Sequence, residues 1–164
     1  MATAGSTAGL RGNTPNYEYV TSKQPVISGA GATRTLLESE SGSVVLLDRF
    51  AGTRFTLPVA VPGTNFTFLT NVTNNSCSII TNISSSTPII IGDLVVNASP
   101  IGAGTSFQAL GADLMVKIAM NGTTTGGQQG SRIVLTALSS GTWFASGLVN
   151  GTGTLATPFS ALSV

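Results

Sequence analysis

Two glutamates in the segment LLESES are the residues best spaced for acid–base chemistry. Glu38 and Glu40 lie two positions apart, so both would project from one face of an extended strand. A glycosidase pair needs two carboxyl groups that face each other across a pocket, roughly 5–10 Å apart. Neighbours on one exposed segment do not meet that requirement, and we interpret the pair as a solvated strand edge.

The remaining residues offer little further chemistry. Histidine is absent from all 164 residues, which excludes Ser-His-Asp and Cys-His catalysis and removes the commonest metal ligand. Asp93 and Asp113 each follow a glycine-containing turn and do not form a calcium-binding loop pattern. The segments GAGAT and GAGTS lack the third glycine and the lysine of a phosphate-binding loop. We therefore expect no catalytic residue, no cofactor, no metal and no enzymatic activity.

Cys77 is the single cysteine, so no disulfide can form within the chain. We expect a small buried apolar side chain there, with intermolecular pairing as the alternative. Seven N-x-Ser/Thr sequons begin at Asn65, Asn71, Asn74, Asn82, Asn97, Asn121 and Asn150. Glycosylation requires secretion, and the first residues lack the apolar core of a signal peptide. We therefore interpret the sequons as polar faces and turns of β structure, in a protein made in a cytoplasm.

The composition points to a protein that works through contact with other proteins. Charged residues make up 8% of the chain, against about 25% in an ordinary soluble domain. The net charge is +1, which provides no long-range field to attract nucleic acid or an anionic membrane. No apolar run approaches the ~18 residues of a membrane helix. A surface poor in lysine and glutamate repels its neighbours weakly, so it suits close packing.

Residues 1–35 differ from the rest and are predicted to form an extended N-terminal arm. The segment has scattered glycine and proline and little apolar periodicity, so alone it buries too little to offset its ordering entropy. Tyr17 and Tyr19 point the same way on an extended strand and are candidate partner contacts. The arm would order on a neighbouring subunit; a disordered tail is the alternative.

Residues 36–164 are predicted to form one all-β domain, an antiparallel β-sandwich or barrel-like fold. Strand-sized segments recur about every 8–12 residues with turn signals between them. The stretch 46–63 and the strand after it are interpreted as an antiparallel meander, with a positive φ at Gly52. Phe55 and Leu57 on one strand, and Phe66 and Phe68 on another, are expected to share one buried layer.

Later segments continue the pattern. Residues 132–138 and 142–149 are predicted to form a hairpin, and 121–131 an exposed, mobile loop. Residues 113–120 would be a strand with Leu114, Val116, Ile118 and Met120 on one face, with a helix as the alternative, and Gly92 would mark a bulge or tight turn. No convincing repeat of 20–50 residues is present, so a solenoid is not expected.

Trp143 and Phe144 are adjacent, so in a strand they face opposite ways. One of them belongs to the core and the other is exposed as a contact, for protein in preference to carbohydrate. We take Trp143 as a further candidate partner contact.

Two segments resemble small structural proteins of tailed bacteriophages. In the first, ESGSVVLLDRFAGTRFTLPVAVPGTNFTFL, an apolar strand leads to a glycine turn, a strand ending in Leu-Pro, a connector and an aromatic-rich strand. The second, RIVLTALSSGTWFASGLVNGTGTLA, is similar to the closing hairpin of the same group. Together they cover about a third of the chain, and residues 74–131 match no motif of the group.

The resemblance implies a capsid decoration (cement) protein, which binds the outer surface of the assembled head. Its partners would be the major capsid protein and further copies of itself, often as a homotrimer, and its location would be the virion surface. These phage proteins have no catalytic residues that could be assigned to positions of this chain. Two alternatives stay open: a virion host-attachment or carbohydrate-binding β module, which would need Trp143 as an exposed platform, and another minor capsid or tail component.

Overall fold

The computed structural model describes residues 24–82, 88–98 and 102–161. These residues form strands and two short 3₁₀ turns, and the described ranges contain no α-helix. The elements in chain order are β1 Val26–Ile27, β2 Thr33–Thr35, η1 Glu38–Glu40, β3 Val44–Leu47, β4 Arg54–Thr56, β5 Asn65–Thr70, β6 Cys77–Ile80, β7 Ile89–Ala98, β8 Gly104–Ala109, η2 Gly111–Asp113, β9 Met115–Met120, β10 Arg132–Ser139, β11 Thr142–Gly151 and β12 Phe159–Ala161. The prediction of an all-β chain is confirmed for these ranges.

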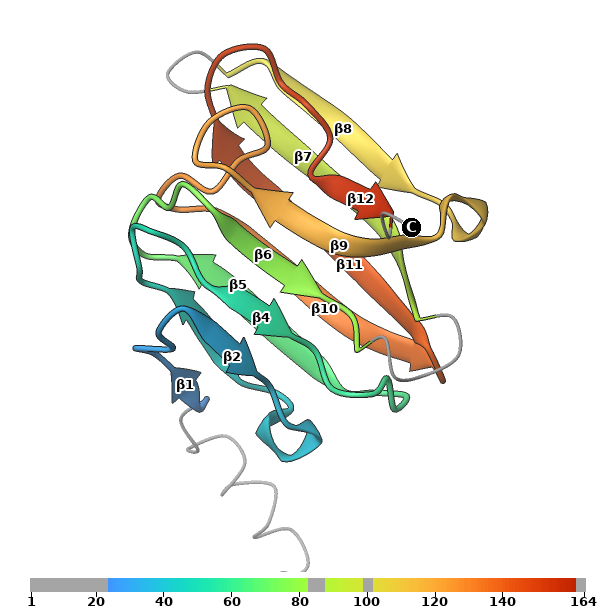
Figure 1. The fold of residues 1–164 in the computed structure, drawn as a ribbon. Coiled ribbons are helices and arrows are strands. Elements are labelled where there is room, and N and C mark those ends of the chain that lie inside the picture. The colour runs from blue at the N-terminus through green and yellow to red at the C-terminus, as the bar shows by residue number, and fades with distance from the viewer. Residues whose placement is uncertain (1–23, 83–87, 99–101, 162–164) are drawn as a thin grey trace, which may run out of the picture.

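The strands form two sheets that lie one over the other (Figure 1). The seven-stranded sheet has the order β1-β3-β5-β10-β11-β7-β8, and the five-stranded sheet has the order β12-β9-β6-β4-β2. Both sheets are mixed. β1, β3 and β5 are parallel to one another, as are β2, β4 and β6, whereas β10 is antiparallel to both β5 and β11. The prediction of an antiparallel arrangement is therefore wrong.

The chain alternates between the sheets from β1 to β6, and this alternation explains the parallel pairs. β3 and β5 are neighbours in the seven-stranded sheet, while β4, which lies between them in sequence, belongs to the five-stranded sheet. The predicted meander over 46–63 is thus a crossing to the other sheet and back. A turn signal shows that the chain changes direction, but it does not show which sheet the next strand joins.

This alternation winds the N-terminal part into three turns, each with one strand in each sheet. Paired residues in successive turns are 18 and 23 positions apart in one sheet and 21 and 24 apart in the other. The turns differ in length, so this winding leaves no fixed period in the sequence.

One apolar core lies between the sheets, and its members come from both. Phe55 and Leu57, from β4 and the residue after its end, are fully buried, as are Phe66 and Phe68 from β5. The rings of Phe55 and Phe68 meet edge to face with centroids 5.6 Å apart. The predicted buried layer is confirmed, although Phe55 and Leu57 lie on one sheet and Phe66 and Phe68 on the facing sheet.

The predicted hairpin is confirmed, and two local predictions around glycine and leucine are corrected. β10 and β11 pair antiparallel, with an irregularity between Ala137 and Ser139. Leu114 has a left-handed φ of 49° and is 55% exposed, so it precedes β9 and does not join its buried face. Gly92 makes no bulge, because β7 stays in register with β11 through it. Its φ of 120° instead lets the two backbones approach, and a Cβ there would lie 2.0 Å from the carbonyl oxygen of Ala145.

The loop predicted to be exposed, 121–131, has a buried centre. Gly122, Gly126 and Gly127 are all buried. The side-chain oxygen of Asn121 accepts hydrogen bonds from the backbone N–H groups of Thr123 at 3.0 Å and Thr125 at 3.1 Å. Hydrogen bonds to the backbone hold this loop in place, and it has no apolar anchor residues. Its sequence therefore has the composition of an exposed loop.

The predicted arm includes two described strands. β1 is the edge strand of the seven-stranded sheet and β2 the edge strand of the five-stranded sheet. Ile27 and Ala30 pack against the core. Residues 1–23, including Tyr17 and Tyr19, lie outside the described residues.

Candidate functional site

The aromatic residue predicted as a surface contact is part of the core. Trp143 is 1% exposed, and its ring centroid lies 6.2 Å from that of Phe66. It is therefore unavailable as a contact or as a carbohydrate platform, and this prediction is corrected. Its neighbour Phe144 is 37% exposed and faces the outside of the seven-stranded sheet. The other two predicted contacts, Tyr17 and Tyr19, cannot be placed, since they precede the described residues.

The acidic pair lies in the 3₁₀ turn η1 and not on a strand edge. Glu40 forms an ion pair with Arg34, and its second carboxylate oxygen accepts the backbone N–H of Leu37 at 2.8 Å. Glu38 is exposed. The interactions of Glu40 hold the chain between β2 and β3, so its role is structural.

Within the described residues, no group of three or more histidine, cysteine, aspartate or glutamate side chains could hold a metal ion. No helix in the same ranges is long and apolar enough to cross a membrane.

Cys77 is buried at the start of β6, as predicted. Burial raises the pKa of its thiol to about 11, because the thiolate would lose its hydration, while a hydrogen bond with the backbone of Thr53 opposes that shift. At neutral pH the side chain is a protonated, apolar group. A thiol of this kind is a poor nucleophile.

The raised pKa predicts a specific loss of stability at high pH. The folded thiol holds its proton up to about pH 11, whereas a thiol with the ordinary pKa of 9.0 loses it earlier. The contribution to stability is complete below pH 9 and is lost as the pH rises from about 9 to about 11. Urea unfolding of the wild type and of Cys77→Ala should therefore diverge: the wild type loses more stability across this interval. If the free energy of unfolding falls equally with pH in the two proteins, the raised pKa of Cys77 is contradicted.

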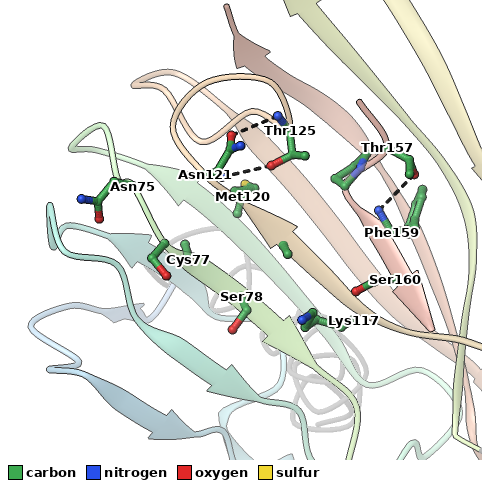
Figure 2. A pocket seen from close by; sticks show the side chains of 13 residues that line it. Asn75, Cys77, Ser78, Lys117, Met120, Asn121, Thr125, Thr157, Phe159 and Ser160 are labelled. Carbon is green, nitrogen blue, oxygen red and sulfur yellow. Dashed lines mark hydrogen bonds between the residues drawn. The ribbon is translucent and has the colours of Figure 1, made fainter. Parts of the chain in front are cut away.

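A hollow lies on the outer side of the five-stranded sheet, over β6, β9 and β12 (Figure 2). Its volume is about 400 Å³. Ser78, Lys117 and Ser160 form its floor on three neighbouring strands. The loop residues Asn121 and Thr125 form part of its wall.

The chemistry of this hollow suits weak polar binding and not catalysis. Lys117 is the one charged residue that lines it, and none of the lining residues is a carboxylate or a histidine that could act as a base. The hydroxyl oxygen of Ser160 is buried and has no hydrogen-bond partner among the described residues. Phe159 is 3% exposed, so it offers no ring on which a sugar could stack. The hollow can hold water or a small anion.

The outer side of the seven-stranded sheet has a different character. Residues there alternate with buried ones along each strand, and many of them are apolar. We call this surface the apolar face and define it by its outward apolar side chains: Val44, Leu46, Leu69, Ile91, Val95, Val134, Phe144 and Leu148. The usual outer face of a sheet is polar, so this surface is an exception.

The five-stranded sheet shows the contrast. Its outward positions include Arg54, Thr56, Ser78, Lys117 and Ser160, which are charged or hydroxyl-bearing, beside the apolar Ile80 and Ala119. The outer face of this sheet is therefore more polar and more basic than that of the seven-stranded sheet, where Thr67, Thr136 and Ser146 lie among the apolar side chains. Such an asymmetry is typical of a protein with a partner on one side.

The sequence analysis did not identify the apolar face, although a signal for it was present. The runs VVLL in β3 and III at the start of β7 lack the alternation of a half-exposed strand. Uninterrupted apolar runs are typical of strands covered on both sides. These runs were the sequence signal for an apolar outer side of the seven-stranded sheet.

No protein-family model matches the chain, and no curated protein or solved structure matches it either.

Proposed function

We propose that this chain is a capsid decoration protein, a virion structural protein with no enzymatic activity. In this proposal its two sheets form a β-sandwich that attaches to the major capsid protein on the outer surface of the assembled head. The resemblance of residues 40–69 and 132–156 to phage structural proteins supplies the viral context.

The observation that carries the proposal is the apolar face. A sheet whose outward side chains include Leu46, Leu69 and Leu148 gains stability when a protein surface covers it. A decoration protein needs such surfaces more than it needs a chemical site. Because the bound protein favours the assembled state, each contact would stabilise the shell by mass action.

The test is electron microscopy of virus particles that carry the protein and of particles that lack it. We expect density for many copies at symmetric positions on the outside of the head, and heads without it should break at lower temperature. Absence of the protein from purified particles would overturn the proposal. A few copies at the tail would favour the minor tail component instead.

The N-terminal segment offers a separate prediction about attachment. We propose that residues 1–23 strap the domain to a neighbouring subunit through Tyr17 and Tyr19. Deleting residues 2–23 should leave the melting temperature within about 2 °C of the wild type and reduce attachment to heads, because all described core contacts remain. Deleting residues 2–30 serves as the contrast, since it also removes β1 and the core contacts of Ile27 and Ala30. Undiminished attachment of the shorter deletion would refute the strap.

A further inference from the structure

We propose that the apolar face binds the apolar face of a second copy of this chain, in a two-fold symmetric pair. The inference rests on the proposed function for the idea that this surface makes a protein contact, and it assigns that contact to a second copy, so that the pair would meet the shell through its other surfaces. It names the partner, and it is tested in solution without any virus particle.

One row across this face is apolar except for a single arginine. It runs through Leu46, Leu69, Arg132, Leu148 and Val95, which pair in register on β3, β5, β10, β11 and β7. Leu148 is 43% exposed, although it lies near the middle of the sheet. Covering a large apolar side chain at this place removes its surface from water, which favours an interface there.

The face is close in size to a standard dimer interface. Seven strands with a spacing of ~4.8 Å span roughly 29 Å, and the two longest strands extend over roughly 30 Å. β1, β3, β5 and β8 are shorter, with two to six residues each, so the sheet fills only part of this rectangle. A standard interface buries about 800 Å² of each partner, which is near the area that the sheet offers.

Two charged side chains interrupt the apolar face, and they are of opposite sign. Arg132 projects outward from β10 and Asp93 outward from β7, with β11 between them. They are offset by two strands and by two residues along the strands, so their Cα atoms lie roughly 12 Å apart. Among the described residues, neither side chain has a hydrogen-bond or ion-pair partner.

A two-fold axis lying in the plane of the interface would pair these charges. This axis crosses β11 between Ser146 and Leu148 and is perpendicular to the line joining Arg132 to Asp93. Rotation about it exchanges the two positions. Each Arg132 then faces the Asp93 of the other copy, and the pairing occurs twice per dimer. A surface with one cation and one anion is thus complementary to itself, and burying it against itself leaves neither charge unmatched.

This geometry favours two copies over three. A two-fold contact uses the same patch on both subunits, whereas a cyclic trimer needs two different patches on each chain. The apolar face is a single patch. It therefore disagrees with the homotrimer that the phage resemblance implies, and a mass measurement separates the two.

The first experiment measures the mass of the full chain in solution by sedimentation equilibrium. We expect two chains per particle for the wild type. Arg132→Asp and Asp93→Arg should each raise the dissociation constant at least tenfold, since each places like charges opposite one another twice. Arg54→Asp, on the outer side of the five-stranded sheet, and Glu38→Arg, in η1, are the matched controls and should leave the mass at two chains. Thermal unfolding verifies that every variant is folded.

The decisive experiment mixes the two single variants. Arg132→Asp carries two aspartates on the face and Asp93→Arg carries two arginines, so an equimolar mixture should form a heterodimer that neither variant forms alone. The double variant that exchanges both charges should return to a homodimer. A partner other than this chain would give neither rescue.

Each other outcome overturns the inference. A wild-type monomer at all concentrations, a mass of three chains, or single variants that stay dimeric would each refute the two-fold pair. The proposed function fails independently: a dimer that is absent from virus particles refutes the function alone, and a monomer that decorates heads refutes the pairing alone.

Discussion

Replacing Phe66 with alanine is expected to lower the free energy of unfolding by about 3–5 kcal/mol. Phe66 has no exposed surface, and it lies on β5, near the centre of the seven-stranded sheet. Its ring packs against Trp143 with centroids 6.2 Å apart and an angle of 36° between the ring planes. Truncation removes this contact and leaves a cavity between two sheets that the surrounding strands hold apart. Urea denaturation followed by tryptophan fluorescence would measure the loss.

Phe50→Ala is the matched control for that substitution. Phe50 is 66% exposed in the turn between β3 and β4, so the same truncation there should cost less than about 1 kcal/mol. If Phe66→Ala costs no more than Phe50→Ala, the register of β5 in the core is wrong.

The substitution Gly52→Ala should be as damaging as the loss of a core ring. Gly52 has a φ of +78°, and a Cβ at this position would lie 2.0 Å from the carbonyl oxygen of Ser76. Alanine must therefore adopt a left-handed conformation and also push the backbone before β6 away from the turn. We expect a loss of roughly 3 kcal/mol or more, from the conformational strain and the displaced contact together. Thermal and urea unfolding would measure it.

Gly42→Ala separates the two causes. Gly42 has a φ of +84°, close to that of Gly52, but no atom lies within 4 Å of a Cβ built there. It should cost only about 1–2 kcal/mol, the conformational strain alone. Equal losses for the two variants would show that the approach of Ser76 to Gly52 is unimportant.

Local sequence patterns predicted the features that depend on neighbouring residues. The alternation in NFTFLT placed Phe66 and Phe68 on one buried face, and the glycine of the RFAG turn indicated a positive φ. The hairpin of β10 and β11 followed from the short turn between two apolar runs. Each of these features is decided within about ten residues of chain.

The features that were missed depend on contacts between distant residues. The pairing of β3 with β5 is settled only when β4 joins the other sheet, and no local signal carries that information. Alternation likewise shows that Trp143 and Phe144 face opposite sides but not which side is the core. Trp143 faces inward because its neighbours in register, Ala137 and Ile90, are both buried.

The candidate site was predicted least well, for a related reason. An interface made of side chains from β3, β5, β7, β10 and β11 exists only after the strands are ordered in the sheet. The sequence analysis placed the contacts on conspicuous aromatic residues, Tyr17, Tyr19 and Trp143. The structure buries Trp143 and presents a surface of aliphatic residues that are individually ordinary.

The winding of β1 to β6 allows further turns of chain to be added at one end of the fold. Each turn adds one strand to each sheet, and the first turn, β1 with β2, pairs only with the turn that follows it. Among the described residues, β1 and β2 are the edge strands of the two sheets there, and the backbone groups of such edges can accept a further strand. About twenty residues inserted at that end would lengthen the body by one layer and leave the order of β5, β10, β11, β7 and β8 unchanged. Variation in length among proteins built this way is therefore expected to accumulate at β1 and β2, away from the hairpin of β10 and β11.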